Sequence, residues 1–133
     1  MTRTPGEPER IDAAQLPTPP TKKRGKVTSP TQRSLAYLRA HGWLCHIVER
    51  WNAFAKVRQD VYGFGDILAC HPVHGIALVQ TTTATNLAAR RKKIAAEGRA
   101  ARWLVCGGKI LLHGWSQRGP VRGWDVTEEW VQR

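Results

Sequence analysis

Hydrophobic and polar positions alternate with a helical spacing in the stretch SPTQRSLAYLRAHGW. Leu35 and Leu38 lie three residues apart and mark one buried stripe of a helix. Ser29 suits the N-cap and Pro30 suits the first helical position. Gly42 ends the pattern in the way that glycine commonly ends helices. The spacing therefore predicts a helix that begins at Pro30 and ends before Gly42.

Three short apolar runs follow, and each is bounded by turn-forming residues, which is typical of strands. They span residues 43–51, 62–71 and 76–82, and residues 52–60 connect the first run to the second. The sequence HPVH, residues 71–74, lies where the last two of these strands must turn. Two histidines at this spacing could bind a metal, but a proline in a short loop favours a plain turn.

A second helix is predicted for residues 84–97, where Leu87 and Ile94 share one side and cations share another. After this helix the pattern predicts three more strands, over residues 101–108, 109–119 and 122–130. Gly107-Gly108 predicts a hairpin between the first two of them. Without the short last strand, the element order is α-β-β-β-α-β-β, which predicts an α/β domain with a mixed central sheet flanked by helices.

Residues 1–29 differ from the rest of the chain, because they hold five of the eight prolines and few large apolar side chains. Such a segment buries too little surface to offset its ordering entropy, so we expect a disordered, basic, proline-rich tail before a single domain at residues 30–133. The tail ends in a basic cluster made of Lys22, Lys23, Arg24 and Lys26. This cluster is either an arm that grips phosphates or a solvated end of the chain.

Composition adds a strong charge imbalance, with 21 Lys and Arg against 10 Asp and Glu and a net charge of +11. Such a charge favours a polyanionic partner, and DNA is our expectation. No apolar run is long enough to span a membrane, and the N-terminus has no apolar signal core. The three cysteines form no Cys-x-x-Cys pair, which favours buried thiols in a reducing compartment. We therefore expect a cytoplasmic protein without a membrane partner.

The chemistry centres on Asp66, an acid placed among apolar residues in the second expected strand. A buried carboxylate is unfavourable unless it is paired or binds a metal. Gly63 and Gly65 precede it and allow a ligand to approach closely, although an edge acid that pairs with Arg58 is the alternative. In the hairpin of strands 62–71 and 76–82, Asp66 is expected opposite Gln80.

The segments GFGDILA and IALVQTT, followed by a basic helix in this element order, resemble the PD-(D/E)xK nuclease superfamily. That superfamily includes restriction endonucleases and Holliday-junction resolvases, and the resemblance covers residues 30–115. It implies a restriction-endonuclease-like αβββαβ core in which Asp66 is the first metal-binding acid. Gln80 takes the place of the second acid and Thr82 takes the place of the lysine. No proline precedes Asp66, which follows Gly65.

The resemblance implies a site for Mg²⁺, or for Mn²⁺, held by Asp66 and Gln80. Mg²⁺ prefers oxygen ligands, so the Gln80 amide oxygen and the backbone carbonyl of Thr81 can serve as further ligands. Thr82 cannot supply the positive charge that a lysine gives to a reacting phosphate. We expect Lys93 or Arg90 to supply it instead.

Other residues offer alternatives for the missing groups. Lys56 and Arg58 are the next candidates for the cation, and Asp60 and Glu49 are candidates for a second carboxylate. The family often carries a glutamate on its first helix, and Gln32 lies nearest to that place. Its position three residues after Ser29 is equally explained by a capping box.

The consecutive cations from Arg90 to Lys93 point around a helix, so only some of them can face one phosphate, and a solvated face is the alternative. Trp115 is either a base-stacking residue or part of the core. The side chains expected to contact DNA are Lys22, Lys23, Arg24, Lys26, Arg58, Arg90, Lys92 and Arg118.

Together these features predict a metal-dependent endonuclease that hydrolyses DNA, with Asp66, Gln80, Thr82 and Lys93 as the catalytic positions. Its small size fits a structure-selective or phage-type accessory nuclease in a bacterial or phage-infected cell, and by analogy a homodimer that cuts both strands. A DNA-binding protein with a decayed nuclease site is the main alternative. An RNA-associated basic protein is the third, and would need no role for Asp66.

Overall fold

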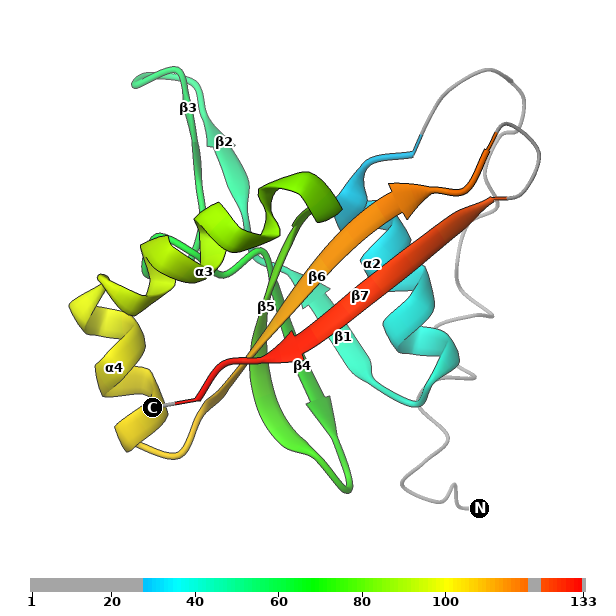
Figure 1. Cartoon of the computed structure of the whole chain (residues 1–133). Helices are drawn as coiled ribbons and strands as arrows, with labels where there is room; N and C mark the ends of the chain where they lie inside the picture. Colours follow the sequence, from blue (N-terminus) through cyan, green and yellow to red (C-terminus); the bar gives the residue numbers. More distant parts are fainter. Residues whose placement is uncertain (1–27, 120–122, 133) are drawn as a thin grey trace, which may run out of the picture.

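A computed structural model describes residues 28–119 and 123–132 of the 133-residue chain. Its centre is a five-stranded sheet with the strand order β1-β4-β5-β6-β7, and β2 and β3 form a separate two-stranded ribbon (Figure 1). The elements are α2 (Pro30–Ala40), β1 (Leu44–Ile47), β2 (Arg50–Asn52), β3 (Val57–Gln59), β4 (Ile67–His71), β5 (Gly75–Thr83), the 3₁₀ turn η1 (Ala84–Asn86), α3 (Leu87–Ala95), α4 (Gly98–Val105), β6 (Lys109–Gln117) and β7 (Trp124–Trp130). The expectation of an α/β domain with a mixed sheet is confirmed. Most of the expected basic tail, residues 1–27, lies outside the described residues.

Helix α2 begins and ends as its sequence predicts. The Ser29 side chain accepts a hydrogen bond from the Gln32 backbone N–H at 3.1 Å, and Pro30 stands at the first helical position. Gly42, with φ of +90°, follows the last turn in a conformation that favours glycine. Leu35 and Leu38 are buried on the helix face that contacts the sheet.

The sheet is antiparallel from β1 through β4 to β5, parallel between β5 and β6, and antiparallel again between β6 and β7. Helices α3 and α4 make the crossover that the parallel β5–β6 pair requires. Alternate residues of β5 enter two different cores. Val79 packs beneath α2, whereas Leu78 packs with Leu87 of α3 and Ala100 of α4. The sheet thus separates α2 on one face from α3 and α4 on the other.

The strand expected at residues 101–108 is wrong, because these residues belong to helix α4 and its end. Ala100 is buried, and Trp103 and Leu104 pack on the same cluster three and four residues later, which is helical spacing. The Glu97 side chain caps the helix by accepting from the Arg99 backbone N–H at 3.1 Å. The hairpin expected at Gly107-Gly108 is wrong as well, since β6 pairs with β5 and β7.

The single helix expected over residues 84–97 is divided into η1, α3 and the start of the turn before α4. The strand expected at residues 43–51 also divides, because β1 ends at Ile47 and β2 belongs to the ribbon. The strand expected from residue 62 begins at Ile67. Before it, positive φ values at Tyr62 and Gly63 form a turn that buries Phe64 in the core. In residues 28–119 and 123–132, no helix is long and apolar enough to cross a membrane.

Candidate functional site

A polar hollow of about 340 Å³ opens at the end of the sheet where β4 begins and β5 ends. Side chains from α2, the ribbon and α3 meet there with those of the two strands. The hollow is lined by Ser29, Pro30, Thr31, Glu49, Arg58, Asp60, Asp66, Gln80, Thr81 and Arg90. Segments that are far apart in the sequence thus contribute to one site.

Asp66 lies at the base of this hollow and is 4% exposed. The pairing of Ile67 with Val79 places it beside the end of β5. One carboxylate oxygen, Oδ2, accepts hydrogen bonds from Gln80 Nε2 at 3.0 Å and from the Thr81 backbone N–H at 2.9 Å. The Thr81 hydroxyl lies 3.3 Å from the same oxygen. The expected juxtaposition of Asp66 and Gln80 is therefore present.

Burial raises the pKa of Asp66 from 3.8 to about 7, since desolvation disfavours the charged carboxylate. The hydrogen bond from the Thr81 backbone acts in the opposite direction. Glu49 raises the pKa of Asp66 further through its charge and a hydrogen bond, and the charge of Asp60 adds to this. The site therefore concentrates negative charge that nearby groups neutralise incompletely, and a cation there would favour ionised Asp66.

Among the other carboxylates, Glu49 has the largest effect on the pKa of Asp66. Its Oε2 lies 3.4 Å from the Thr31 hydroxyl and 3.4 Å from Arg58 Nη1. The backbone N–H groups of Val48 and Glu49 both point to the Asp66 carbonyl, at 3.0 and 3.4 Å, which fixes the chain after β1 against the start of β4. Asp60 also lines the hollow, so both sequence candidates for a second acid reach the site.

The donor atoms in the hollow suit a hard divalent cation. Gln80 Oε1 is buried and has no hydrogen-bond partner among the described residues, while Nε2 of the same amide donates to Asp66. Oxygen ligands of this kind are what Mg²⁺ and Mn²⁺ bind. Within the described ranges, no group of three or more His, Cys, Asp or Glu side chains is placed to hold a metal ion. A metal bound in this hollow would need a mixed ligand set, with the carboxylates of Asp66 and Glu49 and the amide oxygen of Gln80.

Two of the four cations expected near the hollow line it, and two do not. Arg58 and Arg90 line it, whereas Lys93 and Lys56 are exposed and are not among the lining residues. Thr82, in the place of the family's lysine, is buried in β5 and does not line the hollow either. Thr81 takes part through its backbone N–H and hydroxyl, which donate to Asp66.

The remaining residues expected to contact DNA are scattered. Lys92 is exposed on α3, and Arg118 forms an ion pair of 3.2 Å with Asp125. Lys22, Lys23, Arg24 and Lys26 lie outside the described residues. Trp115 is buried, and its indole N–H donates to Ser34 Oγ at 2.8 Å. Trp115 is therefore part of the core and not an exposed base-stacking residue.

Thr31 is a site residue that the sequence interpretation missed. Its hydroxyl lies 2.9 Å from the Thr81 hydroxyl and so connects α2 to the donors of Asp66. The signal was present, because Thr31 precedes Leu35 and Leu38 by four and seven residues and therefore shares their buried face. Gln32, the weaker candidate on this helix, is exposed.

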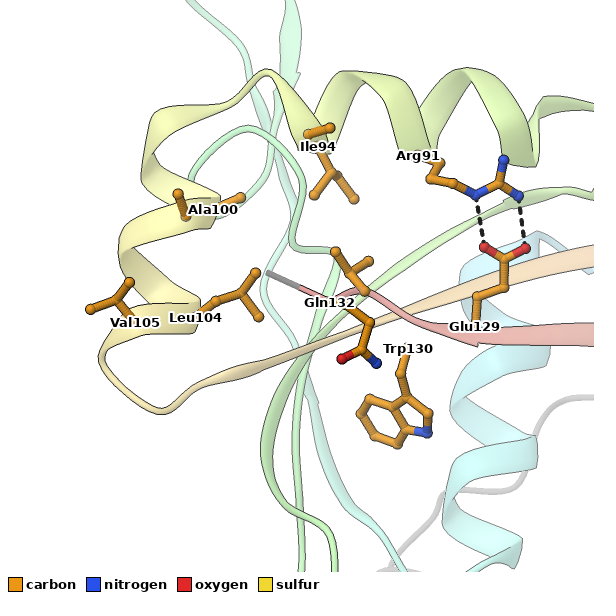
Figure 2. A pocket seen from close by; sticks show the side chains of 11 residues that line it. Arg91, Ile94, Ala100, Leu104, Val105, Glu129, Trp130 and Gln132 are labelled. Atoms are coloured by element: carbon orange, nitrogen blue, oxygen red, sulfur yellow. Dashed lines mark hydrogen bonds and ion pairs between the residues drawn. The ribbon is translucent and has the colours of Figure 1, made fainter.

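A second hollow, of about 490 Å³, lies between α3, α4 and the end of β7 (Figure 2). Its walls are mainly apolar side chains such as Ile94 and Leu104. Its carboxylate, Glu129, is held by Arg91 through hydrogen bonds of 2.9 and 2.8 Å. Among the described residues that line this larger hollow there is no unpaired acid or base, so the hollow at Asp66 is the better candidate for a functional site.

The histidines of HPVH form a turn between β4 and β5, as expected. His71 Nδ1 accepts hydrogen bonds from the backbone N–H groups of Val73 at 3.0 Å and His74 at 3.4 Å. The His74 ring stacks on Trp43 with an interplanar angle of 9°. The nitrogen of His71 that faces the turn is therefore occupied by backbone donors and is not free to ligate a metal.

Comparison of the chain with protein-family models, with curated proteins and with solved structures gives no significant match.

Proposed function

We propose that the protein is a metal-dependent nuclease of the PD-(D/E)xK kind that hydrolyses DNA phosphodiester bonds. The observation that carries the proposal is the placement of Asp66 beside Gln80 in one polar hollow, with Glu49 and two arginines at its walls. The succession α2, β1, β4, β5, α3 and β6 is compatible with a restriction-endonuclease-like core. The net charge of +11 supports a polyanionic substrate.

In this proposal Asp66, Glu49 and Gln80 Oε1 hold Mg²⁺ or Mn²⁺. When bound, the metal supplies Lewis acidity and lowers the pKa of a water nucleophile. Asp66 must be ionised to serve as a ligand, and its pKa of about 7 lies within reach of physiological pH. Gln80 contributes oxygen without charge, so Glu49 is the residue that restores the second negative charge.

The arginines at the hollow take the part of the family's lysine. Arg58 reaches the hollow from the ribbon and Arg90 reaches it from α3. A guanidinium can donate two hydrogen bonds to a phosphate and retains its charge at any relevant pH. We therefore assign the stabilisation of the developing negative charge to these arginines rather than to Lys93.

A DNA-binding protein with a decayed nuclease site is the second candidate. The observation that favours it is Thr82, which is buried where the family has a lysine. The hydrogen bond between Asp66 and Gln80 also satisfies part of the site without a metal. Such a protein would bind DNA and leave it uncut in both Mg²⁺ and Mn²⁺.

The test is cleavage of linear, nicked and branched DNA in Mg²⁺ and in Mn²⁺. Asp66→Ala should abolish cleavage and leave DNA binding nearly unchanged, because it removes a ligand and not a phosphate contact. Glu129→Gln is the matched control, since it removes a carboxylate from the other hollow and should still allow cutting. Cleavage that persists in Asp66→Ala would place the chemistry elsewhere, and no cleavage by the native protein would favour the second candidate.

Gln80→Glu separates the two candidates further. A second charge beside Asp66 should tighten metal binding by about tenfold or more, since a charge–charge contact in a partly buried site contributes on the order of 1–2 kcal/mol. An active enzyme should then need less Mg²⁺ for half-maximal cleavage. Titration of the cleavage rate with metal measures this, and an unchanged metal requirement would remove Gln80 from the ligand set.

A further inference from the structure

The β2–β3 ribbon stands apart from the five-stranded sheet, with which it shares no strand pairing. It leaves the sheet after β1 and returns before β4, and Figure 1 shows it extending beyond the body of the molecule. Its two strands pair in the register Arg50↔Gln59, Trp51↔Arg58 and Asn52↔Val57. The ribbon therefore connects β1 to β4, the strand that begins directly after Asp66.

The tip of the ribbon holds an aromatic side chain in full contact with solvent. Phe54 is 97% exposed. The turn beneath it is well defined, because Asn52 Oδ1 accepts from the backbone N–H groups of Phe54 and Ala55, each at 3.0 Å. The Lys56 N–H closes the turn onto the Asn52 carbonyl at 2.7 Å. With Trp51 and Val57, Phe54 gives the ribbon three exposed large apolar side chains that contribute nothing to the core, which points to a contact outside the described fold.

One face of the ribbon carries both an exposed aromatic side chain and a cation of the hollow. Trp51 is 58% exposed and lies directly opposite Arg58. Residues that face each other across two strands project to the same side. Arg58 lines the hollow at Asp66 and pairs with Glu49. An exposed indole therefore lies next to the cation that we assign to the reacting phosphate.

The charge of the ribbon identifies the kind of partner. Residues 50–59 contain three cations, Arg50, Lys56 and Arg58, and no acid. Cations close to exposed aromatic rings suit a molecule with phosphates along its outside and flat bases within it. A purely apolar protein partner would leave these charges unmatched at its interface.

The geometry points to the ribbon as a wedge that enters DNA next to the cut, with Phe54 inserted at a base step and Trp51 stacked on a base near Arg58. This inference rests on the proposed nuclease function and names its substrate class. Inserting a side chain requires two neighbouring base pairs to unstack. The free-energy cost of this is smallest where the DNA already has a mismatch, a nick or a branch. The enzyme should therefore prefer DNA with such a defect over an intact duplex of the same sequence.

The test measures binding of the full chain in Ca²⁺ to two duplexes that differ by one mismatch, with 2-aminopurine beside the mismatch. The native protein should bind the mismatched duplex about tenfold more tightly, given the usual contribution of one stacked base, and should increase the fluorescence of the probe. Phe54→Ala should lose most of the preference and the fluorescence increase, and Phe54→Trp should keep both. Val73→Ala is the control, because Val73 is also apolar and largely exposed, at 78%, but lies in the β4–β5 turn at the far end of the sheet.

Equal binding of both duplexes by the native protein, or a preference that survives Phe54→Ala, would overturn the wedge. A change of sedimentation coefficient in Phe54→Ala would also overturn it, since the ribbon would then join copies of the chain. Cleavage assays on the same variants keep the two proposals distinct. Cutting without a Phe54-dependent preference contradicts only the wedge, and a Phe54-dependent preference without any cutting contradicts only the nuclease.

Discussion

Asp66 is buried among hydrogen-bond donors without an ion-pair partner among the described residues. Arg58, the partner that the sequence suggested, pairs with Glu49 instead. The raised pKa of Asp66 means that the folded protein favours the protonated carboxyl more than the unfolded chain does. A group of this kind is unfavourable for folding at high pH, and its presence is understandable if a cation binds there.

This leads to a prediction for pH dependence. The contribution of Asp66 to stability is fully present below pH 3.8, the ordinary pKa, and is lost as the pH rises through about 7. Without metal, Asp66→Asn should therefore stabilise the protein at pH 8 relative to the native chain, by on the order of a few kcal/mol. Urea unfolding at pH 5 and pH 8 measures the effect, and equal stability of the two proteins at pH 8 would contradict the raised pKa.

Mg²⁺ provides the control for that experiment. If Asp66 is a ligand, Mg²⁺ should raise the melting temperature of the native protein at pH 8, because a ligand that binds only the folded state stabilises it. The same addition should leave Asp66→Asn nearly unchanged. An equal increase in both proteins would show that the metal binds elsewhere.

A second buried network acts on stability rather than on chemistry. Trp115 donates to Ser34 Oγ, Ser34 lies 2.7 Å from His113 Nδ1, and His113 Nε2 lies 2.9 Å from Glu128 Oε2. Burial lowers the pKa of His113, so the ring is held neutral between one donor and one acceptor. Ser34 and His113 are fully buried, which excludes contact with a substrate and makes this a link between α2 and the sheet.

We expect Ser34→Ala to lower the free energy of unfolding by about 1–3 kcal/mol, because it leaves the Trp115 N–H and a histidine nitrogen unsatisfied in the core. Denaturant unfolding at neutral pH measures this. Ser116→Ala on the exposed end of the same strand, β6, is the control and should change stability little. A neutral Ser34→Ala would show that the network does not hold α2 in place.

At the scale of elements, the parts of the fold that the sequence predicted are those with local signals. Ser29, Pro30 and Gly42 determine the ends of α2 by themselves. The β4–β5 hairpin has a turn of three residues, 72–74, which fixes the register that brings Asp66 to Gln80. Both could be read from the sequence because the interactions that form them lie close together in the chain.

The misinterpreted elements depend on distant contacts. Trp103 and Val105 are of types that favour strands, but they lie in the crossover between the parallel strands β5 and β6, which is usually helical. Likewise Glu49 directly precedes the ribbon and Asp60 directly follows it. Both reach the hollow because the two ends of the ribbon lie close together there. No local pattern reports that geometry, so the sequence offered these two acids only as alternatives.

Glycines at the two ends of α4 allow a prediction about how this helix contributes to stability. A Cβ atom at Gly108 would lie 2.2 Å from the Trp103 ring, which also donates to the Lys109 carbonyl at 2.7 Å. Gly108→Ala should therefore displace this ring and lower the free energy of unfolding by roughly 1–3 kcal/mol. Gly98→Ala is the matched control, because nothing lies within 4 Å of its Cβ and alanine favours helix. Thermal unfolding of both variants measures this, and equal loss in both would mean that Trp103 does not pack as described.

At the scale of the whole molecule, the positive charge is far larger than the described ion pairs neutralise. The carboxylates of Glu49, Glu97, Asp125 and Glu129 each pair with an arginine. The chain still carries a net charge of +11, part of it in the basic cluster before α2. The start of α2 lines the hollow, and the basic cluster precedes that start by only a few residues in the sequence. A DNA strand bound at Asp66 would then pass near the start of the described structure.

The last prediction concerns this basic tail. Deletion of residues 1–27 should leave the fold intact, because the two core clusters are built from residues 35–131. It should weaken DNA binding and reduce the slope of log K against log salt by up to about 3 to 4, since the four cations of the basic cluster leave with the segment. Deletion of residues 1–20 is the control, because it keeps Lys22, Lys23, Arg24 and Lys26 and should retain the native slope. Binding measured from low to moderate salt separates the two deletions. If both bind with the native slope, the cluster is a solvated end of the chain, and the contacts with phosphate belong to the ribbon and the arginines at the hollow.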